Sequence, residues 1–357
     1  MRRSLVISIF CMLISGCSNI TYYTQAISGH LQVISATQPI SDVIHDTATE
    51  PALRQKLEQV IAIREFASRE LHLPDNRSYL SYVDLGRPFV VWNVFAAPEF
   101  SVEPEKWCLL FVGCINYRGY YDKKDAEAFA YELRQTGLDT YITGIPAYST
   151  LGYFNDPVLN TFLRLGEQET ARIIFHELAH QLVYVGGDST FNESFATAIE
   201  NEGMHRWLTR TANRPQIREF NARLERQAQF HRQVAGSRAK LKEIYESSLS
   251  KEAKQSAKVE VFAEMEQNYA RLKNSWGGYN GYDQLFNQPL NNAGLASVTL
   301  YTQWVPAFNA LLEKEGGDLP RFYQRVSVLA QLPESERSAT LNLLLPNNEA
   351  APMAETN

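Results

Sequence analysis

The chain has 357 residues, a formal net charge of -6 and 21% charged residues. This length allows a sizeable hydrophobic core, arranged in one large or two modest domains. The sequence has no basic stripe with interleaved aromatic residues, and that absence argues against a nucleic-acid partner.

The N-terminus has the pattern of a secretory signal. Two arginines precede an apolar run over residues 5–14, and small residues follow the run. The run is too short to span a bilayer, which requires about 20 helical residues. We therefore predict a signal peptide over residues 1–16.

Residues 13–17, Leu-Ile-Ser-Gly-Cys, also resemble the bacterial lipobox. That resemblance implies cleavage before Cys17 and acylation of this cysteine, and Ser18 after it resembles lipoproteins sent to the outer membrane. Residues 17–50 would then be the lipid-anchored N-terminal segment of a cell-envelope protein that faces the periplasm; whether they form a tether or dock on the body stays open. The alternative is an ordinary cleaved signal peptide followed by a coincidental cysteine.

The next part of the chain mixes helical and strand patterns. Pro51 begins a helical segment that ends near residue 71, with apolar residues on one face. A second helical segment over residues 122–135 is closed by Gly137. Apolar or alternating runs predict strands at residues 78–83, 89–95, around Cys108 and at 140–143.

Cys108 and Cys114 are the two cysteines that remain after maturation removes Cys11 and uses Cys17. In an oxidising compartment an even pair of cysteines predicts a disulfide. Two buried free thiols are the alternative. Neither interpretation makes them zinc ligands, because their spacing does not match a Cys-x2–4-Cys pair.

The pattern H-E-x-x-H occurs at residues 176–180 in a helical setting. His176 and His180 project from the same side of a helix, so both imidazoles can reach one Zn²⁺. Glu177 is beside them, free to act as a base. Apolar flanks predict a buried helix that stops at residues 186–187, both glycine. The alternative is a pair of satisfied core histidines, whose burial costs several kcal/mol unless they are partnered.

A catalytic zinc site needs a third protein ligand and leaves one position for water. The long metzincin pattern fails, because it requires Gly and His where this chain has Val183 and Gly186. Glu193, after the glycine turn, is our predicted third ligand. The competing role for Glu193 is a capping box with Thr190.

Three more side chains near the motif have candidate roles. Glu200 and Asp188 are reserve ligands, or partners that orient a histidine. A turn-rich loop over residues 144–157 precedes the motif. Tyr148 in this loop is a candidate donor to the oxyanion that develops during hydrolysis, although aromatic residues in such loops more often just pack.

Beyond the motif the sequence is mainly helical. Residues 213–275 predict two long amphipathic helices broken near 247–250, which would clamp substrate, bind a protein partner or simply pack on the body. Residues 276–345 form a helical C-terminal region, in which an aromatic loop over 276–282 precedes helices over 292–315 and 319–332. The tail over 346–357 is expected to be disordered. The predicted fold class is α+β, with a zincin-like core and small mixed sheet over residues 51–212 and a mainly α-helical C-terminal region.

Five motifs of the chain are the lipobox at Cys17, residues 113–120 (GCINYRGY), 147–152 (AYSTLG), 176–180 (HELAH) and 192–196 (NESFA). Together they resemble the bacterial family labelled putative or predicted aminopeptidases. The resemblance covers most of the mature chain and implies a gluzincin-like zinc peptidase that acts on peptide or protein substrates. The Gly-x-Met-Glu-Asn element with which well-studied zinc aminopeptidases hold the substrate amine does not occur here.

The expected mechanism follows from these residues. His176, His180 and Glu193 would hold one Zn²⁺ per chain, which lowers the pKa of its bound water toward ~7. Glu177 would take the proton of that water and pass it to the leaving amine. The candidate donors to the oxyanion are Tyr148, Tyr117, Arg118 and His205.

The alternative function is that of a non-catalytic envelope lipoprotein. In this interpretation the metal is structural or vestigial, and the helical hairpin over residues 213–275 binds a protein partner. The presence of Glu177 argues against it, because a purely structural metal site needs no base. The sequence leaves open the substrate, the choice between chain ends and internal bonds, and the oligomeric state.

Overall fold

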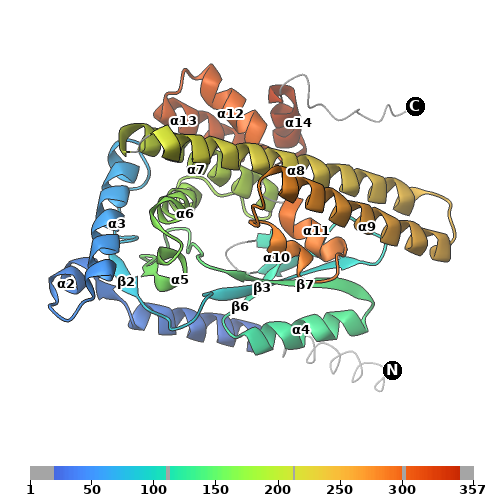
Figure 1. The fold of residues 1–357 in the computed structure, drawn as a ribbon, viewed down its shortest axis with the longest axis horizontal. Coiled ribbons are helices and arrows are strands. Elements are labelled where there is room, and N and C mark those ends of the chain that lie inside the picture. Colours follow the sequence, from blue (N-terminus) through green and yellow to red (C-terminus); the bar gives the residue numbers. More distant parts are fainter. Residues whose placement is uncertain (1–19, 110–112, 212–213, 300–302, 346–357) are drawn as a thin grey trace, which may run out of the picture.

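The computed structural model describes residues 20–109, 113–211, 214–299 and 303–345. The predicted signal peptide, Cys17 and the tail over residues 346–357 lie outside the described residues. The described chain is a mixed α and β fold, mostly helical with small sheets (Figure 1), as the sequence predicted. No helix in the described ranges is both long and apolar enough to cross a membrane.

The main sheet is built around strand β3, Val91–Pro98. β6, Arg118–Tyr120, and β7, Leu138–Ile145, pair with its two edges, both antiparallel. The strand order is therefore β6-β3-β7. Most residues of β3 are buried, because helices cover both faces, and this explains why its sequence is a continuous apolar run rather than an alternating one.

Two smaller strand groups lie beside the main sheet. β4, Trp107–Leu109, and β5, Gly113–Ile115, form a hairpin in which Cys108 and Cys114 are joined by a disulfide. The structure thus favours the disulfide over two free thiols. The other group contains β1 (Gln38–Pro39), β2 (Ser81–Val83) and β8 (Val158–Leu159) in the order β1-β2-β8.

Helices pack on both faces of β3 and β7 (Figure 1). On one face lies α4, Lys123–Gln135, which buries Ala126 and Ala130. On the other face lie α11, Asn292–Thr299, and a hairpin of two long helices, α8, Arg214–Glu246, and α9, Lys251–Ser275. The break between α8 and α9 falls at residues 247–250, as predicted.

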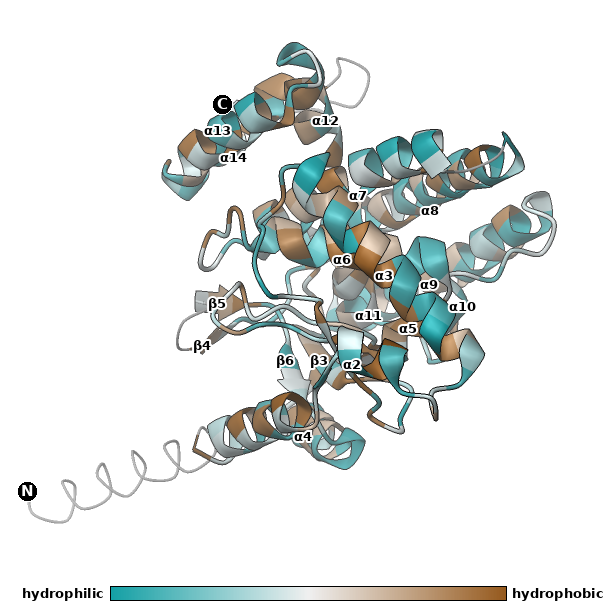
Figure 2. Cartoon of the chain, turned by 90° about the vertical axis from the view of Figure 1, so that its left-hand side faces the viewer, coloured by the Kyte–Doolittle hydropathy of each residue, from teal (hydrophilic) through white to brown (hydrophobic). Residues whose placement is uncertain are grey.

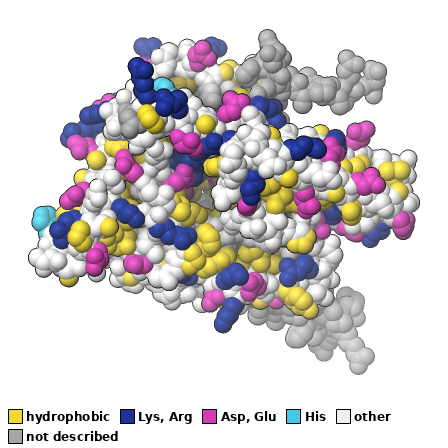
Figure 3. Space-filling view, in the orientation of Figure 1, with side chains coloured by type: hydrophobic (Ala, Val, Ile, Leu, Met, Phe, Trp, Pro, Cys, Tyr) yellow, Lys and Arg dark blue, Asp and Glu magenta, His cyan; other side chains and the backbone are white. Residues whose placement is uncertain are grey.

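The α8–α9 hairpin is anchored to the sheet. Phe230 and Met265 are buried in one core with Tyr141 of β7. Lys258 donates a hydrogen bond to the Asp139 carboxylate at 2.7 Å. Acidic and basic side chains are interspersed along the rest of the hairpin, at the right of Figure 3. The interpretation of a helix pair packed on the body is therefore favoured over a protruding clamp.

A larger hydrophobic core surrounds α6, Glu167–His180, which packs between α3, Pro51–Arg69, and α7, Ser189–Thr211. Figure 2 shows hydrophobic residues on these helices and hydrophilic residues on the outer parts of the hairpin. The remaining helices are α2 (Ile40–His45), α5 (Asn160–Leu163), α10 (Asp283–Phe286), α12 (Val305–Lys314), α13 (Leu319–Ala330) and α14 (Glu334–Leu344).

Residues 20–35 form a helix that docks on the body, which settles the choice that the sequence left open. Tyr22 is buried and packs edge-on against Tyr120. The Gln25 amide donates to the Gly119 carbonyl at 3.1 Å and accepts from the Tyr121 N–H at 3.2 Å. This N-terminal helix is therefore fixed to the edge of the main sheet at β6.

Candidate active site and metal centre

Helix α6 presents the two histidines of the motif from one side. The rings of His176 and His180 meet edge to face, with centroids 4.9 Å apart. The helix ends at His180, before the glycine pair at which the sequence predicted its end. The N–H groups of Gln181 and Leu182 donate to carbonyls three residues earlier, so the last turn is tightened and the chain leaves the helix there.

A short turn brings α7 back against α6. The Val185 N–H donates to the Asn192 side chain, and the Asn192 amide donates to the Val185 carbonyl, each at 2.8 Å. Asp188 accepts the Phe191 N–H at 3.0 Å and therefore caps α7. The capping box between Thr190 and Glu193 does not form, which leaves the Glu193 carboxylate available to the histidines.

Asp188 is not a reserve ligand, contrary to one of the roles considered from the sequence. Its second oxygen accepts hydrogen bonds from Arg337 of α14, at 2.6 and 2.9 Å. This buried ion pair joins the start of α7 to the C-terminal helices. Asp188 thus stabilises the turn, and Glu193 is the carboxylate of the candidate metal cluster.

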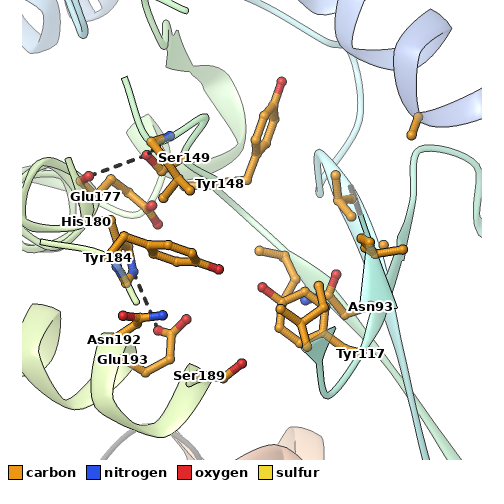
Figure 4. Close-up of a pocket in the computed structure, with 18 of the residues that line it drawn as sticks. Asn93, Tyr117, Tyr148, Ser149, Glu177, His180, Tyr184, Ser189, Asn192 and Glu193 are labelled. Atoms are coloured by element: carbon orange, nitrogen blue, oxygen red, sulfur yellow. Dashed lines mark hydrogen bonds and ion pairs between the residues drawn. The ribbon is translucent and has the colours of Figure 1, made fainter. Parts of the chain in front are cut away.

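Three potential ligand atoms converge between α6 and α7. Glu193 Oε2 lies 3.3 Å from His176 Nε2 and 3.7 Å from His180 Nε2, and the side chains of His180 and Glu193 lie close together in Figure 4. All three ligand atoms lie within 4.8 Å of one another. Two imidazole nitrogens and a carboxylate oxygen are a ligand set that catalytic zinc takes. Since one oxygen faces two nitrogens, a cation among them would satisfy all three groups.

Glu200 orients one of the histidines. Its Oε2 lies 3.0 Å from His176 Nδ1, and its Oε1 accepts from Arg172 at 2.7 Å. Burial opposes ionisation of Glu200, but Arg172 and His176 outweigh it and hold the pKa at about 2. The ionised carboxylate fixes the His176 ring so that Nε2 faces Glu193. Glu200 is therefore an orienting partner, one of the two roles expected for it.

Glu177 and Glu193 lie close together but differ in proton affinity. Burial raises the pKa of Glu177, while His176 and His180 oppose this. Burial also disfavours the charged form of Glu193, yet the two histidines hold its pKa at about 2. Two neighbouring carboxylates with separated pKa values suit different tasks. Glu193 suits an ionised ligand, and Glu177 suits a group that accepts a proton.

Two hollows meet at the motif. We call the first the sheet-side hollow: it encloses about 330 Å³ between β3, β6, the start of α7 and the N-terminal helix. We call the second the hairpin-side hollow: it encloses about 410 Å³ between β7, α6, α8 and the segment from α10 to α11. Four residues line both hollows, namely Ile145, Ala147, His176 and Glu177.

The loop between β7 and β8 forms the wall of the site beside Glu177. Asp156 accepts the Thr150 hydroxyl at 2.7 Å and the Thr150 N–H at 3.1 Å. Ser149 in turn donates to the Glu177 carbonyl at 3.5 Å, a contact drawn in Figure 4. These bonds hold the loop against the end of α6.

Tyr148 is in this wall, but its hydroxyl is not directed at the site. Its Oη lies 2.8 Å from His30 Nδ1 of the N-terminal helix. In Figure 4 the hydroxyl points away from Glu177 and His180. The candidate role of Tyr148 as a donor to the oxyanion is therefore not supported by this geometry, and Tyr148 instead joins the wall to the N-terminal helix.

Two other candidate donors lie outside both hollows. The Arg118 guanidinium stacks over the Tyr22 ring at 4.1 Å, on the far side of β6. His205 is exposed and lines a separate surface hollow with Phe66 and Glu70. Neither side chain lines a hollow beside Glu177, so this geometry does not support Arg118 or His205 as the donor to the oxyanion.

Tyr117 and Tyr184 are the phenols that line the sheet-side hollow beside Glu193. Burial and the Glu193 charge raise the pKa of Tyr117, and the same causes raise that of Tyr184 to about 12. Both phenols stay protonated at neutral pH and can donate. The sequence analysis named Tyr117 but missed Tyr184, although its position four residues after His180 was a usable signal.

The disulfide hairpin packs against the turn between α6 and α7. A Cβ at Gly113 would lie 2.7 Å from the Gly187 nitrogen and 2.9 Å from the Gly186 carbonyl carbon. Gly113 and Gly187 also have positive φ angles of 80° and 90°, which glycine adopts at no steric cost. The glycine pair thus allows close approach of the hairpin instead of ending α6.

No curated protein and no solved structure matches the chain. A family model described as "Putative aminopeptidase" matches residues 21–341. This match spans both hollows and all of the residues at which α6 and α7 meet. The chain therefore belongs to the putative aminopeptidase family.

Proposed function

We propose that the protein is a zinc-dependent, gluzincin-like peptidase of the bacterial cell envelope. The observation that carries the proposal is the convergence of His176, His180 and Glu193 within 4.8 Å, with Glu177 at the junction of the two hollows. The family assignment supports a peptidase. The small sheet before the motif, and the third ligand on the following helix, support a zincin-like core.

The residues divide the chemistry among them. Zn²⁺ bound by the two histidines and Glu193 would lower the pKa of a water molecule and polarise a substrate carbonyl. Glu177 takes a proton from the attacking water as the C–O bond forms, and gives it to the amine nitrogen as the C–N bond breaks. Tyr184 or Tyr117 donates a hydrogen bond to the carbonyl oxygen as negative charge develops on it.

The first test is metal content together with Glu177→Gln. The chain from residue 18 onward, purified without chelator, is expected to hold about one zinc, because the site offers three protein ligands. Glu177→Gln should keep that zinc and lose roughly 10²–10⁴-fold in peptide hydrolysis, the usual contribution of a general base.

Glu167→Gln on the same helix is the matched control, since Glu167 faces Gln59 and lies away from the site. Glu167→Gln should leave both the zinc content and the rate of peptide hydrolysis unchanged. If Glu177→Gln cleaved peptides as fast as the parent enzyme, Glu177 would not be the general base. A chain that takes up no zinc on titration contradicts the site as a whole.

We also propose that the protein is anchored through an acylated Cys17. The structure describes the N-terminal helix from residue 20, and residues 18–35 contain no Lys, Arg, Asp or Glu. Ile20, Ile27 and Leu31 share one face of this helix and are 67%, 59% and 57% exposed. Such a face suits the surface of a bilayer. Cys17→Ser should release the protein into the soluble periplasmic fraction, and continued sedimentation with membranes would contradict the anchor.

A further inference from the structure

We infer that this enzyme cleaves internal bonds of extended peptides rather than releasing single residues from the N-terminus. The inference rests on the proposed peptidase function and adds a substrate class to it. Three features of the site carry it: space on both sides of Glu177, the placement of charges in that space, and a strand edge that continues into it.

The first feature is the pair of hollows. Each has a volume in the range of small-molecule sites, about 300–1,000 Å³, and the two are lined by largely different residues. Because Glu177 lines both, a carbonyl placed beside it has room for chain in the two directions. A site that accepts a single terminal residue would need substantial space on one side only.

The second feature is that every acidic side chain lining the two hollows already has an assigned role or a charged partner. A free N-terminus is a cation, and burying a cation is costly unless a carboxylate pairs with it. In the sheet-side hollow the acidic residues are Glu177 and Glu193, the assigned base and the assigned ligand. Each therefore already has a function that an ammonium group would disturb.

The hairpin-side hollow is no better suited to an amine. Apart from Glu177, the acidic residue that lines it is Glu200, which already binds Arg172 and His176. Arg172 itself lines the same hollow and carries a positive charge. Among the described residues of the two hollows, no further carboxylate offers a partner to a terminal ammonium. A peptide bond carries no charge, so its burial in the hollows needs no carboxylate partner.

The third feature is the outer edge of β7. The carbonyls of Thr140 and Ile142 face outward and accept hydrogen bonds from Asn291 and Gln288, both at 3.0 Å. Successive residues of a strand alternate in direction, so Gly144 is the next to face outward, beyond these two amides. An extended peptide can pair with the backbone there, as in other strand-addition complexes.

Pairing along this edge places the substrate backbone beside Ile145 and Ala147, two of the four residues that the hollows share. Backbone pairing uses residues on both sides of the cleaved bond and needs no chain end. The three features therefore agree on a substrate that runs through the site.

The test uses the zinc-loaded chain and one peptide library of mixed sequence in two forms. One form has free ends, and the other is N-acetylated and C-amidated; products are identified by mass spectrometry. We expect both forms to be cut at the same internal bonds with equal kcat/KM. Release of single N-terminal residues, or a loss of about tenfold or more on acetylation, equivalent to 1.4 kcal/mol, would overturn the inference and leave the proposed peptidase intact.

Hydrolysis of neither form by the zinc-loaded chain would overturn the proposed function and the inference together. The two failures are therefore distinguishable in one experiment.

Variants that fill one hollow at a time supply a second readout. Ala26→Phe adds a ring to the sheet-side hollow, and Ser297→Phe adds one to the hairpin-side hollow, with no change to a metal ligand. Both should reduce kcat/KM for the capped library at unchanged zinc content. Exposed Ser28 and Ser256 give matched controls, Ser28→Phe and Ser256→Phe. Full activity of either filled variant would show that substrate occupies one side only, against the inference.

Discussion

Helix pairs α6–α7 and α8–α9 are both joined by short connections, but they bury different kinds of side chain. Between α6 and α7 lie buried His180, Asn192 and Glu200, each 7% exposed or less. The core of the α8–α9 pair is mainly apolar, with Phe230 and Met265 at 1% and 0% exposed, and its buried Lys258, 5% exposed, is paired with Asp139 of β7. Charged groups in a core are costly unless they satisfy one another, so their cluster distinguishes α6–α7, which holds the proposed active site, from the mainly apolar α8–α9 pair.

The ion pairs of the two helix pairs differ in how far they are exposed to solvent. Lys240 and Glu264 on the hairpin are 2.7 Å apart but about half exposed, and such pairs contribute roughly 0–1 kcal/mol. The Arg172–Glu200 pair has the same separation, with Glu200 5% exposed. Removing one partner there leaves a buried charge without compensation. The short distance alone therefore does not identify a functional pair.

The largest expected effect comes from Met265→Ala, which tests whether the hairpin is a scaffold. Met265 is fully buried against Phe230 and Tyr141. Its truncation should lower the free energy of unfolding by about 2–5 kcal/mol. Zinc content and kcat/KM below the unfolding transition should stay unchanged. Urea denaturation and elemental analysis measure the two quantities.

Val259→Ala on the same helix is the control, because Val259 is 58% exposed and such changes stay within about ±0.5 kcal/mol. If folded Met265→Ala protein lost its zinc, the hairpin would be part of the metal centre and the distinction between the two pairs would fail.

The sequence was informative where the partners are local. The H-E-x-x-H spacing predicted the arrangement of His176 and His180, and the apolar periodicity predicted α8 and α9. Both rest on the 3.6-residue period of a helix, which involves neighbours along the chain. Glu193 was predicted from its place on the next helix, beyond the glycine turn, as the carboxylate that completes a catalytic zinc site.

The sequence was uninformative where the partner is distant. Tyr148 turns toward His30, 118 residues away, and Asp188 binds Arg337, 149 residues away. No local pattern marks either pair. The docking of residues 20–35 on β6 depends likewise on a strand nearly a hundred residues later. These contacts decide which candidate groups face Glu177, so the donor to the oxyanion was the least predictable part of the site.

A smaller effect is expected from His231→Gln, which tests a titratable side chain of α8 that lines the hairpin-side hollow. Burial lowers the pKa of His231 on α8 to about 4, from an ordinary value near 6.5. Below pH ~6.5 the unfolded chain therefore takes up a proton that the folded chain resists until about pH 4. Stability that is present above pH ~6.5 is lost as the pH falls to about 4, by roughly 3 kcal/mol.

His231→Gln should flatten the free energy of unfolding between pH 4 and 6.5, as urea denaturation at a series of pH values would show. His205→Gln, at an exposed position, is the control and should keep the slope. An unchanged slope in His231→Gln would show that His231 is not the source of the acid sensitivity.

The smallest expected effect comes from Glu200→Gln, which separates an orienting residue from a ligand. The amide keeps the size of the side chain but offers one acceptor in place of two, so either His176 or Arg172 loses its bond. Loss of such a partner typically lowers metal affinity by about 10–100-fold, or roughly 1.4–2.7 kcal/mol. Activity should fall at limiting zinc and recover at saturating zinc, because all three ligands and Glu177 remain.

Glu202→Gln on the same helix is the matched control, since Glu202 bonds Arg206 on the outer side of α7, and zinc affinity should not change. If Glu200→Gln stayed inactive at saturating zinc, Glu200 would take part in the reaction itself and not only hold the His176 ring. If the variant bound zinc as tightly as the parent, the Glu200 bond would serve folding alone. In that case the Glu193 carboxylate would serve metal binding, and the buried Glu200 carboxylate would serve the packing of α7 against α6.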